Sequence, residues 1–268
     1  MSQRTVAAVI PTKNVANVIR PTLESLRFCD EVIIVDMFSS DGTRELCESY
    51  PNVRFFQRDD YIYGNFNFGL EQARSDWIIR LDSDEVISRE LENSIVEVLK
   101  SSPEGQPSAY EALCHLYFFG RRLRHGFGDQ FRTTLFKKGS ASYQVRSEHE
   151  HLQVTGPVGR LTGHYEHFTN PTVSTWIQKT NYYTDKDVER LSDPCTIPAW
   201  RVTYTVLRQF QRLYFAPGWL MRDGYLGFVV AGVAAFSRFL EAAKIWEKAE
   251  ARHDASTQAI NDAGTSTN

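Results

Sequence analysis

Short apolar runs and segments with helical spacing of apolar residues alternate through the first hundred residues. The apolar runs are rich in Val and Ile and are typical of buried strands. They cover residues 6–10, 31–36, 53–57 and 77–81. Helical patterns follow the first three runs, beginning near residues 18, 43 and 65. Alternation of strands and helices predicts βαβ units and a parallel sheet, so we expect an α/β fold.

Polar side chains stand where these strands end. Thr12 and Asn14 follow the first strand, Asp36 ends the second, and Asp82 and Asp84 follow the fourth. Ligands of open α/β sheets collect at the carboxyl ends of parallel strands, so these groups should meet along one edge. The pattern predicts a polar cleft that can hold a nucleotide.

The strand at 77–81 leads into three carboxylates, Asp82, Asp84 and Glu85. Carboxylates this close repel one another unless a cation lies between them. Mg²⁺ and Mn²⁺ prefer oxygen ligands and keep sites free for waters and phosphates. The alternative is a helix N-terminus, with Ser83 or Asp84 as its cap.

No glycine-rich phosphate loop follows the first strand. Neither G-x-G-x-x-G nor G-x-x-x-x-G-K-[ST] occurs there, and the sequence instead reads Pro-Thr-Lys-Asn at 11–14. Phosphates would therefore be neutralised by a metal and by side chains. This favours a metal site over a dinucleotide-binding Rossmann fold.

Composition narrows the class of protein further. The chain has 268 residues, 42% of them hydrophobic, which suffices for one core and an appendage. Its net charge of −3 gives no sign of a nucleic-acid partner. The four cysteines have no metal or redox spacing and predict a reducing, cytoplasmic setting. We expect no signal peptide, and no uninterrupted apolar stretch reaches the roughly 18 residues of a spanning helix.

Several segments, in order, resemble family 2 glycosyltransferases, which have the GT-A fold. They are Val-Ile-Pro-Thr-Lys-Asn (9–14), Val-Ile-Ile-Val-Asp (32–36), Ser-Ser-Asp-Gly-Thr (39–43), Asn67 with Ala73, and Leu-Asp-Ser-Asp-Glu (81–85). The resemblance spans roughly residues 5–100 and is greatest to bacterial lipopolysaccharide-core β-glucosyltransferase-like and related polysaccharide enzymes. It implies a hexosyltransferase-like enzyme that uses a nucleotide-diphosphate sugar, with a UDP-sugar favoured, and inverts the anomeric centre.

The resemblance also implies roles for residues. Asp84, with Asp82, would hold Mn²⁺ or Mg²⁺, and Asp82 would also face the ribose and phosphates. Arg132, on a strand predicted over 131–138, should reach the same edge and can pair with phosphate. The expected nucleotide-sugar-binding residues are Pro11, Thr12, Asn14, Asp36, Asp41, Asn67, Asp82 and Arg132. Asp41 could instead cap the helix that follows it.

The segment Ser-Glu-His-Glu-His-Leu at 147–152 offers the general base. Transfer with inversion needs a group that takes the proton of the acceptor hydroxyl. If the segment is a strand, Glu148 and Glu150 share one face. The resemblance favours Glu150, with Glu148 as the alternative, and a charged edge strand would explain the same pattern without catalysis.

A histidine is expected to complete the metal shell or to touch the diphosphate. Relatives carry one about a dozen positions before a helix lysine, a separation that His167 and Lys179 share. His164 is the alternative, and either could be a surface histidine.

The C-terminal third changes in composition. Residues 200–248 contain seven Lys/Arg and three Asp/Glu residues, a net charge of +4, among many aromatics. The apolar segment 226–240 is short for spanning and suits helices lying in a bilayer interface. A helical hairpin packed on the catalytic domain, or a dimer contact, is the alternative. The tail from 251 to 268 is predicted to be disordered.

We therefore expect a GT-A catalytic domain over 1–168, with a donor half at about 1–100 and an acceptor half at 101–168, then a membrane-associating helical region over 169–250. The expected enzyme is an inverting, metal-dependent glycosyltransferase. It would act on a glycan or lipid-linked acceptor in cell-surface polysaccharide or lipopolysaccharide synthesis, at the inner face of the cytoplasmic membrane. An oligomer is possible. The alternatives are an inactive nucleotide-sugar-binding scaffold and a sugar nucleotidyltransferase, which would want a glycine-rich basic loop after the first strand.

Overall fold

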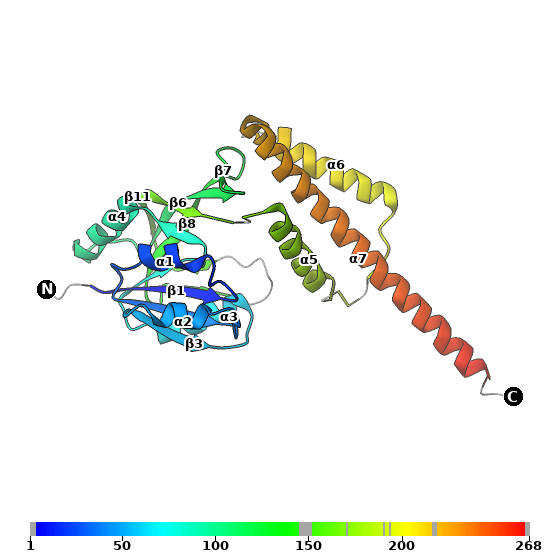
Figure 1. Cartoon of the computed structure of the whole chain (residues 1–268), viewed down its shortest axis with the longest axis horizontal. Coiled ribbons are helices and arrows are strands. Elements are labelled where there is room, and N and C mark those ends of the chain that lie inside the picture. Colours follow the sequence, from blue (N-terminus) through cyan, green and yellow to red (C-terminus); the bar gives the residue numbers. More distant parts are fainter. Residues whose placement is uncertain are drawn as a thin grey trace. The chain divides into compact units, whose positions relative to one another are not determined.

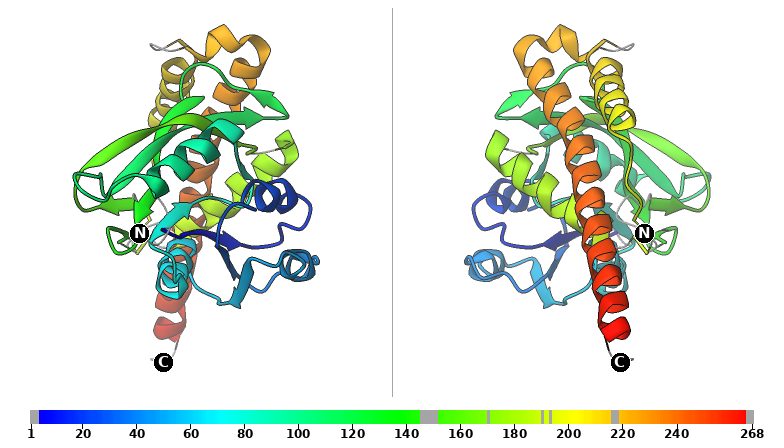
Figure 2. Two further views of the ribbon diagram at one scale, coloured as in Figure 1. Left: turned by 90° about the vertical axis from the view of Figure 1, so that its left-hand side faces the viewer. Right: turned by 90° about the vertical axis from the view of Figure 1, so that its right-hand side faces the viewer.

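The computed structural model describes residues 4–144, 152–169, 171–189, 191–192, 194–215 and 219–265, with side chains as far as residue 252. The chain forms two compact units. The sheet unit comprises residues 1–116 and 129–168, and the helical unit comprises residues 117–128 and 169–268. Figures 1 and 2 show the elements of both.

The sheet unit is built on a mixed sheet with strand order β3-β2-β1-β4-β8-β6-β11-β5. Strands β1 to β4 pair in parallel, as the alternation of strands and helices predicts. Strand β8 then runs antiparallel to β4, and β5 antiparallel to β11. The bounds are β1 Val6–Thr12, β2 Glu31–Asp36, β3 Val53–Gln57, β4 Trp77–Arg80, β5 Glu85–Ile87, β6 Ala109–Phe118, β8 Asp129–Lys137 and β11 Val158–His167.

Helices cover both faces of this sheet (Figure 1). Successive strand residues point to opposite faces, so Ala8 and Ile10 pack on one side while Ala7 and Val9 pack on the other. The first face is covered by α1 (Ile19–Ser25), α2 (Thr43–Glu48) and α4 (Arg89–Lys100). The second is covered by α3 (Ile62–Gln72) and by the hairpin of β9 (Ala141–Tyr143) and β10 (Leu152–Val154).

Helix α3 lies close to the sheet because residue 69 is a glycine. A Cβ atom there would stand 2.4 Å from Cγ1 of Val9, closer than two carbon atoms can approach. The absence of a side chain at Gly69 thus fixes the distance between helix and sheet.

Most predicted boundaries agree with the structure to within a few residues. Strand β4 ends at Arg80, one residue earlier than the apolar run. The reason is a turn at its end, in which the backbone N–H of Glu85 donates to the carbonyl of Asp82 at 3.1 Å. The strand signal and the acidic motif therefore meet at a sharp reversal of the chain.

The helical unit contains β7 (Arg121–Arg122), α5 (Val173–Glu189), α6 (Ala199–Phe215), the 3₁₀ turn η1 (Leu220–Asp223) and α7 (Gly224–Thr265). Lys248 of α7 donates to the carbonyl of Val188 at 2.7 Å and so satisfies the carboxyl end of α5. The carboxylate of Asp223 accepts the backbone N–H groups of Arg124 at 3.0 Å and His125 at 2.9 Å. These bonds hold residues 117–128 to the C-terminal helices.

Helix α7 differs from the expectation in two ways. It continues through Thr265, where the sequence from 251 onward predicted disorder; alanines, the strongest helix formers, recur through that stretch. Residues Leu220–Arg252 are also long and apolar enough to cross a membrane by length and composition, with a mean hydropathy of 1.6 over their most apolar 18-residue window. The apolar segment 226–240 was expected to be helical but short for spanning, because charged residues such as Arg238 and Glu241 interrupt the apolar run.

A buried carboxylate joins three parts of the sheet unit. Glu31, 8% exposed, begins β2. Its Oε1 accepts the backbone N–H of Arg74 at 2.6 Å and of Ser75 at 2.9 Å, and its Oε2 accepts from Nη1 of Arg54 at 2.7 Å. Burial raises the pKa of this carboxyl, but the hydrogen bonds, that from Arg54 foremost, hold it below the ordinary value of 4.5.

Glu31→Gln should lower the free energy of unfolding by about 1–3 kcal/mol near neutral pH, because an amide cannot accept all of these bonds. A lowered folded-state pKa means that the carboxylate's contribution is full above the unfolded pKa and is lost as pH falls through the folded value. The difference between the two proteins should therefore narrow in acid. Urea denaturation at several pH values measures it, and a difference independent of pH would contradict the assignment.

Candidate active site

The turn between β4 and β5 carries the acidic motif. Besides the backbone bond that closes it, the N–H of Asp82 donates to Oε2 of Glu85 at 2.9 Å. The Glu85 side chain is fully buried, whereas those of Asp82 and Asp84 are 33% and 17% exposed. The turn therefore presents the two aspartates with the glutamate behind them.

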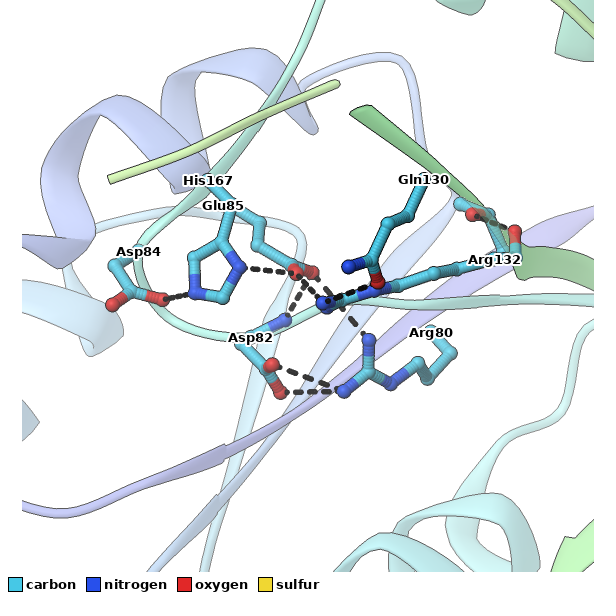
Figure 3. A network of polar contacts seen from close by, with 8 residues as sticks. Arg80, Asp82, Asp84, Glu85, Gln130, Arg132 and His167 are labelled. Atoms are coloured by element: carbon cyan, nitrogen blue, oxygen red, sulfur yellow. Dashed lines mark hydrogen bonds and ion pairs between the residues drawn. The ribbon is translucent and has the colours of Figure 1, made fainter. Parts of the chain in front are cut away.

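The end of β11 brings His167 to this turn (Figure 3). His167 lies opposite Glu85 in the ladder between β11 and β5, and the N–H of Phe168 donates to the carbonyl of Asp84 at 2.9 Å. Nε2 of His167 is 3.3 Å from Oδ1 of Asp84, and Nδ1 is 3.5 Å from Oε1 of Glu85. Asp84 and His167, expected from sequence to share a metal, thus lie side by side.

Two arginines complete the network in Figure 3. Nη2 of Arg80 contacts both carboxylate oxygens of Asp82, at 3.1 and 3.0 Å. Nη1 of Arg80 and Nη1 of Arg132 each lie 3.8 Å from one oxygen of Glu85. Each carboxylate of the motif therefore has a cationic neighbour, and Arg132 reaches the edge that the sequence predicted.

The carboxyls of Asp82 and Glu85 are shifted in opposite directions. Burial raises the pKa of Asp82, but Arg80, His167 and Arg132 together bring it below the usual range. For Glu85, burial and the charge of Asp82 raise the pKa, and Arg80 and His167 only partly offset them. The outer carboxylate is thus the more acidic of the two.

The surroundings of His167 raise the pKa of its imidazole. Burial lowers its pKa, but the hydrogen bond to Asp84, the contact with Cys114 and the charge of Glu85 bring it well above the ordinary value of 6.5. A positive charge is therefore favoured where this ring meets the two carboxylates. A divalent cation can supply that charge in place of the proton.

The residues present fit a bound Mn²⁺ or Mg²⁺. Asp84 and His167 offer one oxygen and one nitrogen donor, which Mn²⁺ accepts readily. Oε1 of Glu85 and Nδ1 of His167 are buried and have no hydrogen-bond partner, as expected of a site whose geometry tightens around a ligand. Donor atoms of Glu85, Cys114 and His167 also lie within 4.8 Å of one another, but a thiol suits softer metals than Mg²⁺.

The expected nucleoside residues gather at the ends of β1 and β2. Thr12 and Asp36 are partners in the parallel register, and Oγ1 of Thr12 donates to Oδ1 of Asp36 at 2.9 Å. The side chain of Asn14 accepts the N–H of Ser40 at 2.9 Å. Pro11 is buried within β1. The sequence therefore placed these residues correctly along one edge, and their role as ligands stays a prediction.

Asp41 and Asn67 hold backbone segments in place. Asp41 accepts the N–H of Ala16 at 3.0 Å and of Thr43 at 3.1 Å, but the N-cap residue of α2 is Gly42 and not Asp41. Asn67 uses both ends of its amide on the backbone of Tyr143, at 2.8 and 3.0 Å. Nucleotide binding by these two residues also stays a prediction.

Three further expectations concern the general base, the alternative histidine His164 and the second metal ligand Asp82. Glu150 and its alternative Glu148 lie outside the described residues. The ring of His164 stacks on His115 with 4.1 Å between centroids, whereas His167 lies beside Asp84, and a metal role for either histidine stays a prediction. Asp82, expected as a second metal ligand, faces Arg80.

Sequence reasoning gave no role to Arg80 or Glu85. A signal for Arg80 was present, because it is the one charged residue in an otherwise apolar strand. Glu85 was recognised only as a third acid. The pairing of Glu85 with His167 could not be predicted, because nothing in the sequence shows that β5 pairs with β11.

Comparisons with known proteins identify the family. Residues 7–156 match the family described as Glycosyl transferase family 2. The lipopolysaccharide core biosynthesis glycosyltransferase LpsC of Rhizobium meliloti (strain 1021) is 30% identical over 234 residues, which cover 84% of this chain and 86% of LpsC. An uncharacterized glycosyltransferase of Rickettsia prowazekii (strain Madrid E) is 24% identical over 252 residues, 90% of this chain and 86% of that protein.

A solved structure, S. aureus TarS 1-349 in complex with UDP-GlcNAc, aligns with 12% identity and a TM-score of 0.47, covering 94% of this chain and 92% of that one. From the family match and LpsC, the chain belongs to glycosyl transferase family 2. It is a glycosyltransferase with a mixed sheet flanked by helices, as in the GT-A fold. The family and fold indicated by the motifs are thereby confirmed.

Proposed function

We propose that the protein is an inverting, metal-dependent enzyme that transfers a sugar from a UDP-sugar to a glycan or lipid-linked acceptor in lipopolysaccharide or related surface polysaccharide synthesis. The observation that carries the proposal is the meeting of Asp84 and His167 at the sheet edge where β1 and β2 end. The name of the relative LpsC supports the acceptor class.

Different residues on this edge would bind different parts of the nucleotide-sugar donor. Asp84 and His167 would hold Mn²⁺ or Mg²⁺, which supplies positive charge to the departing diphosphate when bound. Arg132, 33% exposed, can add a second positive charge. Thr12, Asn14 and Asp36 would line the nucleoside, and Asp82, fixed by Arg80, would face the ribose and phosphates.

The base acts on the other substrate. Glu150, or Glu148, would accept the acceptor hydroxyl's proton while that oxygen bonds to the anomeric carbon. The bond from that carbon to the diphosphate oxygen breaks with its electron pair leaving on the diphosphate. Attack opposite the leaving group inverts the configuration in one step.

Two alternatives are weaker. A sugar nucleotidyltransferase would be expected to have a glycine-rich basic loop after β1, whereas this chain has Pro-Thr-Lys-Asn at 11–14. An inactive nucleotide-sugar-binding scaffold would keep the donor-binding residues but would not transfer sugar. A measurement of turnover therefore distinguishes it from an enzyme.

Asp84→Ala should abolish metal-dependent transfer and the extra thermal stabilisation that Mn²⁺ gives with UDP-sugars, since specific ligands raise the melting temperature. A panel of nucleotide sugars, with and without Mn²⁺, also identifies the donor. Glu97→Ala, at an exposed position on α4, is the control and should behave as wild type. Full metal-dependent turnover by Asp84→Ala would remove this residue from the metal site.

Glu150→Gln should slow transfer by about 10²-fold or more with donor affinity nearly unchanged, because only the proton acceptor is lost. Glu148→Gln, made in parallel, should retain most of the activity. Single-turnover transfer and donor binding measure the two effects. If Glu148→Gln is the slow variant, the base is Glu148, and two active variants would place the base elsewhere.

The helical unit has the surface expected for contact with a bilayer. Every residue of α6, all of which the structure describes, is at least partly exposed. Trp200, Tyr204 and Leu207 are 70%, 58% and 57% exposed, large values for apolar and aromatic side chains. Residues 200–248 carry a net charge of +4. Such helices bind anionic lipid in the interface, which supports a peripheral position at the inner face of the cytoplasmic membrane.

Replacing Arg201, Arg208 and Arg212 of α6 by Gln should release the protein from anionic vesicles. Each basic residue contributes about 1 kcal/mol near such a surface, so the partition coefficient should fall by roughly 10²-fold. Arg20, Arg27 and Arg44, exposed in the sheet unit, changed to Gln give a control with the same charge. Vesicle sedimentation measures the release, and equal release of both variants would contradict a specific role for α6. If α6 instead mediates self-association, the replacement should change the mass of the protein in solution.

A further inference from the structure

Glu85 is a fully buried carboxylate in the middle of the proposed site. A carboxylate in such a place is costly unless its oxygens are engaged. Its Oε2 accepts the N–H of Asp82 at 2.9 Å. Its Oε1 lies 3.5 Å from Nδ1 of His167. The two oxygens thus face donors from two separate segments of the chain.

The backbone builds this arrangement. His167 and Glu85 are directly opposite in the antiparallel pairing of β11 with β5, and opposite side chains on one face of such a pair are neighbours. The bond from the N–H of Phe168 to the carbonyl of Asp84, at 2.9 Å, extends the contact to the metal-side residue. The approach of the imidazole to the carboxylate therefore follows from strand register.

The unsatisfied atoms complement each other. Oε1 of Glu85 and Nδ1 of His167 are both buried without a hydrogen-bond partner. One is an acceptor and the other can donate, so a small closure of their separation satisfies both. The nearby thiol of Cys114 is a much weaker acceptor than a carboxylate. Arg80 and Arg132 lie 3.8 Å from Glu85, a distance that balances charge without a hydrogen bond.

We infer that Glu85 is a positioning residue for the metal site. Its Oε1 receives the Nδ1–H of His167, which directs the lone pair of Nε2 towards a cation beside Asp84. Its Oε2 fixes the turn that carries Asp84. A metal-binding histidine generally donates its other N–H to such a partner, which sets tautomer and ring orientation. The inference rests on the proposed metal site at Asp84 and His167.

The chemistry demands a carboxylate at this position. Glutamine has the same shape but offers one acceptor and one donor in place of two acceptors. It can therefore satisfy either the N–H of Asp82 or that of His167, while its amide N–H₂ faces the other donor. Glu85→Gln should thus loosen one side of the metal site without removing a metal ligand.

The test is Mn²⁺ binding to the full chain, by isothermal titration calorimetry or electron paramagnetic resonance, for wild type, Glu85→Gln and Asp84→Ala. Glu85→Gln should raise the Mn²⁺ dissociation constant by about 10–100-fold. Excess Mn²⁺ should restore most of its turnover, which a general loss of structure would not allow. Glu31→Gln, which removes a buried carboxylate elsewhere in the sheet unit, should bind Mn²⁺ as wild type does.

The outcomes separate this inference from the proposed function. Wild-type Mn²⁺ affinity in Glu85→Gln, with affinity lost in Asp84→Ala, overturns the role of Glu85 alone. Wild-type affinity in both variants overturns the proposed metal site and the inference together. If Glu85→Gln does not fold, Glu85→Asp keeps both acceptors on a shorter side chain and should show weakened binding. Unchanged binding in that variant would likewise overturn the inference.

Discussion

The mutual repulsion of acidic side chains at the end of β4 is the constraint on which the site depends. Asp82, Asp84 and Glu85 occupy one tight turn, and their charges cannot coexist there without compensation. Each carboxylate has a basic side chain beside it: Arg80 contacts Asp82, His167 contacts Asp84, and Arg132 lies near Glu85. Because these cations come from three different strands, the charges of the motif also hold the ends of those strands together.

The two aspartates of the turn differ in how their negative charges are balanced. Arg80 holds Asp82 through two contacts and is committed to it. His167, in contrast, contacts Asp84 through a single nitrogen at 3.3 Å, the atom that we propose binds the metal ion. The turn therefore combines an aspartate held by an arginine with one held by a single histidine nitrogen, and our proposal assigns the metal ion to the second.

Local patterns predicted a large part of this structure. The apolar runs predicted β1 to β4, since strands of a parallel sheet that are mostly buried carry their signal within a few residues. The edge carrying Thr12, Asp36 and Asp84 followed from the same rule. The register of β5 on β11 could not be predicted, because long-range strand pairing leaves no local trace. The contact of Glu85 with His167 was not predicted for that reason, and the extent of α7 was missed because the sequence from 251 onward predicted disorder.

The two units differ in what their surfaces are suited to. The sheet unit packs its buried apolar residues into two clusters, one on either side of the sheet. The helical unit leaves aromatic residues of α6 and α7 exposed among arginines and lysines, beyond what contact between its own helices requires. The exposed aromatic and basic residues of the helical unit are the ones that our proposal places against the lipid surface.

The most direct measurement is the anomalous diffraction of manganese in crystals of the full chain grown with uridine diphosphate. The account predicts one strong peak bonded to Asp84 and to Nε2 of His167 and adjoining the diphosphate. A diphosphate bound with no manganese at those two residues, or manganese bound elsewhere in the chain, would contradict it.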